Sequence, residues 1–432
     1  MNLEEYVREL EPSEERRKRE LARKKSYEIV DHLEEVEDRF TEVVQGDSLY
    51  GQAAPSVFVG RTGYPRVNTG VLQPVASQVD PADHATSSDW YGRLDIDDVL
   101  GRRTSLLNSR RKAAVERPRS QGFLDVQREV AAASDPVDVE VELDGKPRVD
   151  ASLDSIRTPT GPNARAVDAD LAENPSIPRH VDRAISDGDW RAADAVGYLY
   201  DHGYDVYEIQ RVFSTGGLGV EDDRRLVPTR WTITAVDDTV GKKLHREVQQ
   251  LPELGETRVY YNEYMGNRFW VVLGPGRWEF ELVEMKSPGS VWNPRPDDDY
   301  YVASANEGYG GRSRYVEETA GAYYASRLGV LEHLVDVGRQ AKALVLRAVG
   351  DDYWAPVGVW HVREIVRNAF DGPVGTERLV GTTETEEAGR GAELESFHEA
   401  VEGVADLLPI SRDRLRRKST MYNGVQSGLG DF

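Results

Sequence analysis

The sequence contains no cysteine among its 432 residues. It therefore has no disulfide, no thiol nucleophile and no thiolate ligand for a metal. Long apolar runs are also absent, since no stretch approaches the roughly 20 apolar residues that a membrane-spanning helix needs. Residues 1–5 carry neither the basic nor the apolar region of a secretory signal. These absences predict a cytoplasmic protein with no membrane partner.

Several signatures of catalysis are missing as well. The sequence has no Walker lysine motif, no dinucleotide fingerprint after a strand, no Ser-His-Asp order, no zinc-protease helix and no deaminase pattern. Its eight histidines are scattered, which predicts structural rather than metal-binding roles. The residues therefore name no reaction, no cofactor and no metal site, and they leave open whether the protein is an enzyme.

Basic residues are fewer than acidic ones, 54 against 76, and the formal net charge is −22. Such acidity normally argues against a nucleic-acid partner. Here Asp and Glu are spread along the whole chain, Lys is rare beside Arg, and the core segments are normally apolar. This composition resembles that of organisms with molar internal salt. On that interpretation the acidity reflects the solvent, so partners must be inferred from local clusters.

The length exceeds the size at which one core stops growing, so two domains are expected. The patterning predicts an α+β protein with two mixed domains, a helical N-terminal arm and a flexible C-terminal tail. The predicted segments are a charged helical arm over 1–48, a first domain over 49–215, a second over 216–373, an acidic linker with an amphipathic helix over 374–410, and a basic tail over 411–432. The charge run at 16–25 suits either a solvated helix face or an arm facing nucleic acid.

Periodicity predicts the elements within these segments. Helices are predicted over 13–40, 89–113 and 181–213, and strands over 137–143, 341–349 and 354–360. The last strand passes into a helix that carries Arg363 and Arg367. Residues 144–180, rich in Pro, Asp and Asn, predict a long surface connection. Three aromatic, β-branched runs at 258–265, 268–273 and 277–285 predict an antiparallel meander.

Residues 224–238 form a segment with arginines at its start, an apolar centre and two adjacent carboxylates at its end. Its residues 231–236 are rich in β-branched and aromatic side chains, which predicts a buried strand. Asp237 and Asp238 follow directly, where side chains are held rigidly, and are therefore the candidate catalytic base or metal ligands. Neighbouring strand residues point to opposite faces, so the two share a metal only if the strand ends there. A core strand with solvated charged ends is the alternative.

Two glycine-rich loops carry arginines, one at residues 60–66 and the other at 306–314. Glycines let the backbone approach an anion closely while guanidinium groups hold it, and a helix start adds free N–H groups. Ordinary turns are the alternative. The candidate phosphate-binding or nucleic-acid-binding residues are Arg61, Arg66, Arg224, Arg225, Arg230, Arg312 and Arg314.

Three blocks, at residues 56–70, 226–241 and 263–292 with the following Gly-rich loop, together resemble the archaeal Nre family of DNA-repair proteins. The resemblance spans about residues 51–370. It implies a role in the DNA-damage response and a C-terminal motif that binds the sliding clamp PCNA. Many members also carry a cysteine-rich, zinc-binding segment near the N-terminus, which this chain lacks.

The final residues fit the implied motif. Gln426, Leu429 and Phe432 stand at i, i+3 and i+6, the spacing of a clamp-binding peptide. One helical turn places Leu429 and Phe432 on a common face as an apolar plug, while the Gln amide bonds a polar pocket. The second aromatic that usually follows is missing. A disordered tail with chance spacing is the alternative.

Three functions follow from these observations. The first is a repair factor that acts on or near damaged DNA while the clamp holds it. The second is a pure adaptor that joins the clamp to other repair proteins. The third is an enzyme on nucleic acid or nucleotides, a nuclease or a transferase, in which Asp237 and Asp238 act.

Overall fold

The computed structural model describes residues 48–75, 77–116, 122–148, 160–288, 290, 292–293, 299–370, 392–394 and 396–423. Contacts divide the chain into two compact units between Val240 and Gly241, within helix α7 (Thr229–Val248), whereas the sequence placed a boundary after residue 215. We call the described residues up to Val240 the first unit and those from Gly241 the second unit. The predicted domain limits stay predictions.

The first unit is built on a six-stranded sheet in the order β1-β5-β6-β4-β3-β2. Neighbouring strands are antiparallel except β4 and β6, which run parallel. The strands are β1 Ser48–Ala53, β2 Val57–Val59, β3 Arg66–Pro74, β4 Leu106–Ala114, β5 Val137–Arg148 and β6 Asn163–Leu171. The helices are η1 Pro81–His84, η2 Ser88–Trp90, α2 Ile96–Thr104, α3 Gly122–Ala132, α4 Arg179–Ser186, α5 Ala192–Asp201, α6 Val206–Ser214 and η3 Glu221–Asp223.

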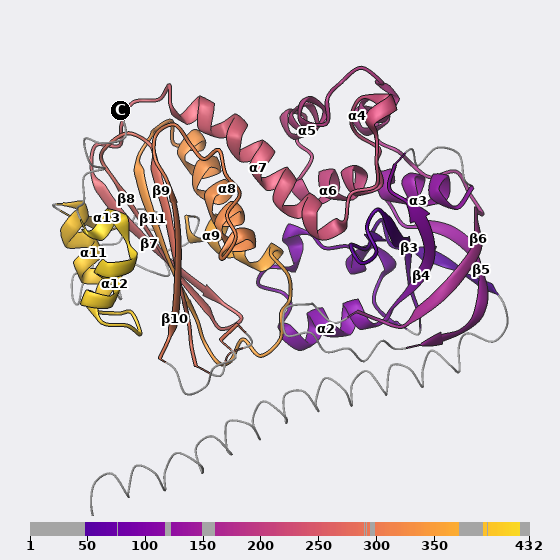
Figure 1. The fold of residues 1–432 in the computed structure, drawn as a ribbon, viewed down its shortest axis with the longest axis horizontal. Helices are drawn as coiled ribbons and strands as arrows, with labels where there is room; N and C mark the ends of the chain where they lie inside the picture. The colour runs from indigo at the N-terminus through magenta and orange to yellow at the C-terminus, as the bar shows by residue number, and fades with distance from the viewer. Residues whose placement is uncertain are drawn as a thin grey trace, which may run out of the picture. The chain divides into compact units, whose positions relative to one another are not determined.

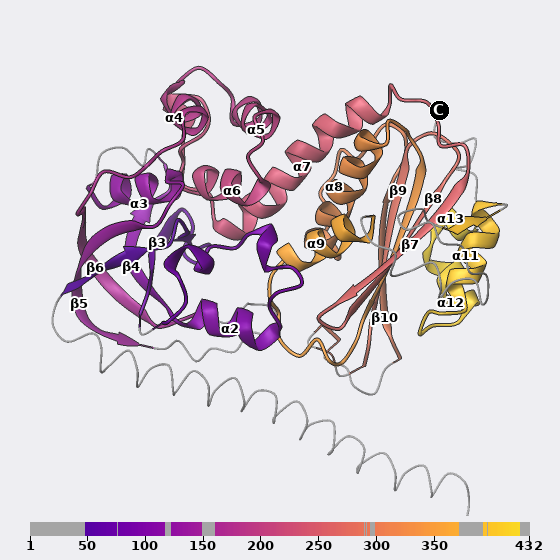
Figure 2. The same cartoon turned by 180° about the vertical axis from the view of Figure 1, so that it is seen from behind.

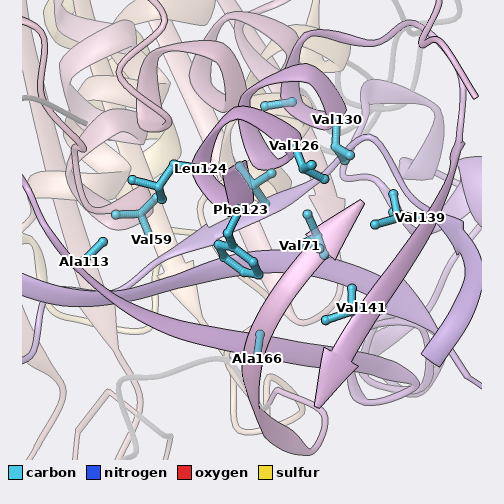
Figure 3. Close-up of a cluster of buried hydrophobic side chains, with 14 of the residues drawn as sticks. Val59, Val71, Ala113, Phe123, Leu124, Val126, Val130, Val139, Val141 and Ala166 are labelled. Atoms are coloured by element: carbon cyan, nitrogen blue, oxygen red, sulfur yellow. The ribbon is translucent and has the colours of Figure 1, made fainter. Parts of the chain in front are cut away.

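The core of the first unit lies between its sheet and α3. Phe123 of α3 is fully buried, and β5 presents Val139 and Val141 to the same cluster (Figure 3). Because alternate residues of β5 are buried and exposed, this strand confirms the half-exposed strand predicted over 137–143. One polar pair, Thr69 and Gln127, lies inside and is joined by hydrogen bonds of 2.6–2.8 Å, which satisfies both side chains.

The second unit holds another six-stranded sheet, in the order β10-β9-β11-β8-β7-β12. The strands are β7 Thr257–Tyr264, β8 Asn267–Gly274, β9 Glu279–Lys286, β10 Tyr301–Glu307, β11 Lys342–Val349 and β12 Ala392–Leu394. The helices are α8 Ala320–Asp336, α9 Trp360–Ala369, α11 Phe397–Ala405, α12 Arg412–Lys418 and α13 Thr420–Asn423. Helices α8 and α9 cover one face of this sheet, and α11, α12 and α13 cover the other (Figures 1 and 2). Two mixed sheets with helices confirm the predicted α+β class.

The predicted meander is only partly correct. Strands β7 and β8 form the expected antiparallel hairpin, but β11 lies between β8 and β9 and runs parallel to β9. Almost every residue of β11 is buried on both faces, and such a strand belongs in the middle of a sheet. The turn at residues 274–276 therefore connects strands that are not neighbours.

The buried strand predicted over 231–236 is wrong, because these residues belong to helix α7. Pro228 precedes the helix, a position that suits its fixed φ angle. The buried residues Thr232, Val236, Val240 and Leu244 recur every four positions, which is the spacing of one helical face. The β-branched composition concealed this period, and tertiary packing overrode the strand propensity.

Other local predictions meet a mixed outcome. Residues 89–113 start in the last part of η2, form an α-helix only at Ile96–Thr104 and then enter β4. The connection predicted over 144–180 contains β6, which sheet pairing stabilises despite its polar composition. Residues 354–359 form no strand before α9. The helices over 181–213, the amphipathic helix now called α11 and the strand β11 are confirmed. The arm over 13–40, the linker residues 371–391 and residues 424–432 lie outside the described residues.

The basic run is part of the folded second unit rather than of a tail. It forms α12, in which Ser411 caps the N-terminus and Leu415 is fully buried. Arg412 pairs with Asp406, and Arg416 pairs with Glu402 at 2.8 Å. The sequence suggested a tail because the run is so charged, but Arg412, Arg414 and Arg416 are paired with acids of the same unit.

Candidate nucleic-acid interface

The loop at residues 60–66 and the start of α7 are tied together in the first unit. The Val59 backbone N–H donates to the Thr229 hydroxyl oxygen at 3.0 Å. The Ser214 hydroxyl donates to the carbonyl of Val227 at 2.8 Å, which fixes the approach to α7. Strand β2 therefore leads into the loop at a point that is held against the helix.

The loop itself has a defined shape. Its Gly60 N–H donates to Asn68 O at 2.8 Å and its Arg66 N–H to Gly63 O at 2.9 Å. Gly63 has a φ of 84°, a conformation that side chains rarely adopt. The Val115 N–H donates to Pro65 O at 2.9 Å, and the Tyr64–Pro65 bond is cis. Both ends of the loop are thus hydrogen-bonded to the sheet, while its side chains point outward and are exposed.

Two aromatic side chains meet at this place. The Tyr64 ring of the loop and the Trp231 ring of α7 have centroids 5.4 Å apart and are tilted by 50°. Tyr64 is 46% exposed and Trp231 is 45% exposed. Large rings are the costliest apolar groups to leave in water, so this exposed pair indicates a binding surface.

Arginines surround the pair. Arg61, Arg66 and Arg230 are exposed, and among the described residues no ion pair holds Arg61 or Arg66. Arg225 is also exposed and is placed beside the loop, because the Leu226 N–H donates to Val115 O at 2.9 Å next to the Pro65 contact. We call Arg61, Tyr64, Arg66, Arg225, Arg230 and Trp231 the arginine–aromatic surface.

The electrostatics of this surface favour an anion. The first turn of α7 holds no acidic residue, and it is the positive end of the dipole of a 20-residue helix. Acidic residues adjoin the surface as well, among them Glu116, which forms a β-bridge with Arg225, and Asp223, whose backbone carbonyl accepts from Arg225 Nε at 3.4 Å. The surface can therefore hold a phosphate with its guanidinium groups and a flat apolar group with its rings.

Arg224 has a different environment. Its guanidinium donates to the carbonyls of Gly219 and Ile185 at 2.7 Å and to that of Asp187 at 2.8 Å. These bonds join the segment before α7 to the end of α4. The side chain is occupied by backbone acceptors, so we leave it out of the arginine–aromatic surface.

Arg312 and Arg314 belong to the second unit. The Arg312 guanidinium lies over the Tyr323 ring at 5.7 Å and donates to Asn306 O. Helix α8 begins at Ala320, so neither arginine stands at the helix N-terminus that the sequence suggested. Their role in binding phosphate stays a prediction.

Asp237 and Asp238 are consecutive residues of α7 rather than the end of a strand. Asp237 is buried and Asp238 is half-buried. Consecutive residues of a helix point about 100° apart, so the two carboxylates do not face one side. In the part of the chain that the structure describes, no three His, Asp or Glu side chains gather as a metal site. The functional role of the pair stays a prediction.

Sequence reasoning missed the aromatic half of the surface. Trp231 was assigned to a core strand, and Tyr64 was treated only as part of a loop. If residues 229–248 are taken as a helix, Thr232, Val236 and Val240 fall on one buried face and Trp231 lies outside that face. This spacing could have predicted that Trp231 is exposed.

Comparison with known proteins places the chain in a family. The family model described as "Archaeal Nre, N-terminal" matches residues 21–293, and "Archaeal Nre, C-terminal" matches residues 307–432. A protein of Haloferax volcanii named DNA repair protein NreA is 53% identical over 437 residues, covering 100% of both chains. The chain belongs to the archaeal Nre family. The resemblance drawn from the sequence is thereby confirmed.

Two further Nre relatives come from Archaeoglobus fulgidus. One, named DNA repair protein NreA, is 39% identical and covers 77% of this chain and 83% of its own. The other, named DNA repair protein NreB, is 36% identical and covers 89% of this chain and 92% of its own. No solved structure matches this Nre chain. Among the described residues, no helix is long and apolar enough to cross a membrane.

Proposed function

We propose that this Nre chain is a DNA-repair protein that the sliding clamp PCNA recruits through Gln426, Leu429 and Phe432. The observation that carries the proposal is the match over the full length to a protein named DNA repair protein NreA. The C-terminal family model extends to residue 432, so the motif lies within the region that defines the family. The spacing of the three residues supports the choice of partner.

Salt gives a physical reason for such a recruitment mode. The acidic composition and the Haloferax relative favour a cell interior of high ionic strength. At about 1 M salt the Debye length is near 3 Å, so electrostatic capture of DNA is strongly screened. Burial of Leu429 and Phe432 is not screened, and salting-out ions strengthen it. Tethering then keeps the folded units near DNA at a high effective concentration.

The fold supports a short tether. Helices α12 and α13 pack on the sheet of the second unit as far as Asn423, with Leu415 and Tyr422 buried. Residues 424–432 follow directly and span at most about 30 Å. A clamp bound at Phe432 is therefore held close to the second unit, rather than at the end of a long flexible linker.

Replacement of Phe432 by Ala is expected to weaken clamp binding at least tenfold. Burial of a Phe side chain contributes about 1.5–3 kcal/mol, and 1.4 kcal/mol is a tenfold change in Kd. The measurement is calorimetric titration of the full-length chain with purified clamp in high salt. A peptide of residues 415–432 is a poorer probe, because Leu415 and residues 419–421 are bound to the sheet of the second unit.

The matched control is Ser427→Ala, which lies between the motif positions and removes none of their side chains. It should bind like the unaltered chain. Equal affinities for Phe432→Ala and the unaltered chain would remove the motif from the proposal. Failure of the unaltered chain to bind the clamp at all would remove the partner.

A further inference from the structure

We infer that the arginine–aromatic surface binds a single DNA strand by stacking its unpaired bases on Tyr64 and Trp231. The inference rests on the proposed role in DNA repair and names the form of DNA that the first unit holds. It does not depend on the clamp motif, whose residues 426–432 form a separate segment of the sequence.

The rings offer a stacking site of suitable chemistry. Every base has a flat π-face, and stacking on an aromatic side chain contributes about 1–3 kcal/mol per base whatever the sequence. Tyr64 and Trp231 are tilted by 50° rather than stacked on one another. Both side chains also remain almost half exposed, so each still offers ring surface to a base.

The backbone segments that carry the two rings are held in place by hydrogen bonds. Trp231 stands in the first turn of α7, where its backbone N–H donates to Pro228 O at 2.7 Å. Tyr64 stands in a loop whose backbone is bonded within itself and to Val115, the residue after β4, and the Val59–Thr229 hydrogen bond joins the loop region to α7. A site that is already ordered loses little conformational entropy when its ligand binds.

The charges fit the backbone of a strand. Arg61 and Arg66 stand on either side of Tyr64 in the sequence, and Arg230 precedes Trp231. Alternation of guanidinium groups with aromatic rings matches the alternation of phosphates with bases. A purely apolar partner would leave the exposed guanidinium groups of Arg61 and Arg66 without a complementary charge, so charge complementarity favours a nucleic-acid strand over an apolar protein segment.

Duplex DNA does not offer the same contact, because each base face is covered by its neighbours in the stack. Base stacking also requires no counterion release, so salt weakens it far less than it weakens phosphate contacts. The surface therefore suits a chain whose acidity indicates a salt-rich solvent, and it favours unpaired DNA over intact duplex.

The test is fluorescence anisotropy of three labelled DNA probes, each about 15 nucleotides long, titrated with the full-length chain in high salt. These are a thymidine strand, the same strand with abasic residues that keep the phosphates, and a blunt duplex. The unaltered chain should bind the thymidine strand at least fivefold more tightly than the other two. Trp231→Leu and Tyr64→Leu should each weaken binding to the thymidine strand by about 5- to 100-fold.

Tyr50→Leu is the matched control, since Tyr50 is a 62% exposed tyrosine of the same unit on strand β1. This variant should bind the thymidine strand as tightly as the unaltered chain. Trp231→Phe keeps an aromatic ring and should therefore bind more tightly than Trp231→Leu. Equal binding of the abasic strand, unchanged binding by Trp231→Leu, or no binding of the thymidine strand would each overturn the inference. Clamp titration of the same samples separates the two proposals, because the ring variants should bind the clamp normally.

Discussion

Replacement of Arg347 by Met is expected to lower the free energy of unfolding of the second unit by about 3–5 kcal/mol, because it leaves a buried carboxylate without its main partner. Arg347 of β11 donates to a Glu284 carboxylate oxygen of β9 at 2.5 Å. These residues are direct neighbours in the parallel register of the two strands. Both are almost fully buried, so water cannot take the place of the lost contact.

The surrounding groups make this arginine hard to replace. Its Nε and Nη2 donate to the Asn267 side-chain oxygen at 3.0 and 2.6 Å, and its Nη2 lies 3.3 Å from His361 Nε2. Lys286 reaches the other Glu284 oxygen at 3.3 Å and keeps this contact in the variant. One substitution thus removes the donors to two buried oxygens, Asn267 Oδ1 and Glu284 Oε1.

Urea unfolding at fixed salt, followed by tryptophan fluorescence, measures the effect. Arg165→Met is the control, because its ion pair with Asp144 in the first unit is exposed and should contribute less than about 0.5 kcal/mol. The double variant Arg347→Met/Glu284→Leu should be more stable than Arg347→Met alone, since it removes the orphaned charge. A loss below about 1 kcal/mol in Arg347→Met would show that the network is not buried in solution.

Replacement of Glu281 by Ala is expected to release helices α12 and α13 from the sheet. The Glu281 carboxylate is almost fully buried and accepts from Ser419 Oγ at 2.8 Å, Thr420 N at 2.9 Å and Met421 N at 3.0 Å. Burial raises the pKa of this carboxyl, while the donors oppose the shift. The Thr420 hydroxyl donates to it as well, at 3.2 Å, so its loss leaves four donors without this acceptor, at a cost of at least about 3 kcal/mol.

Trypsin reports this release directly, since α12 carries five basic residues that its packing protects. Cleavage within residues 412–418 should be at least tenfold faster in Glu281→Ala, and intermediate in Glu281→Gln, which keeps one acceptor oxygen. Glu279→Ala, two residues earlier on the same strand, is the control and should be cut at the rate of the unaltered chain. Equal rates in all variants would show that Glu281 does not hold the C-terminal helices.

The sequence predicted those elements whose side chains repeat with a clear period. Strand β5 alternates between buried and exposed residues, and α11 buries Ala400, Val401 and Val404, so their patterns agree with their packing. Helix α7 was missed because its β-branched residues favour a strand, although its buried positions recur every four. The insertion of β11 between β8 and β9 depends on contacts between distant segments, which a local pattern does not contain.

The candidate interface was predicted in part. Arg61, Arg66, Arg225 and Arg230 were named from charge and glycine spacing, and the structure brings them together in the first unit. Arg224 was named with them, yet its guanidinium bonds three carbonyls. The sequence shows that an arginine is present but does not show which way it points. The Tyr64–Trp231 pair required the tertiary fold, because the two residues are far apart in the chain.

Survival after DNA damage tests the central claim, that this Nre chain acts in repair while attached to the clamp. Cells lacking the gene would receive the unaltered chain, Phe432→Ala or Ser427→Ala at equal protein levels. The account predicts that the unaltered chain and Ser427→Ala restore survival and that Phe432→Ala does not. Full restoration by Phe432→Ala would contradict it.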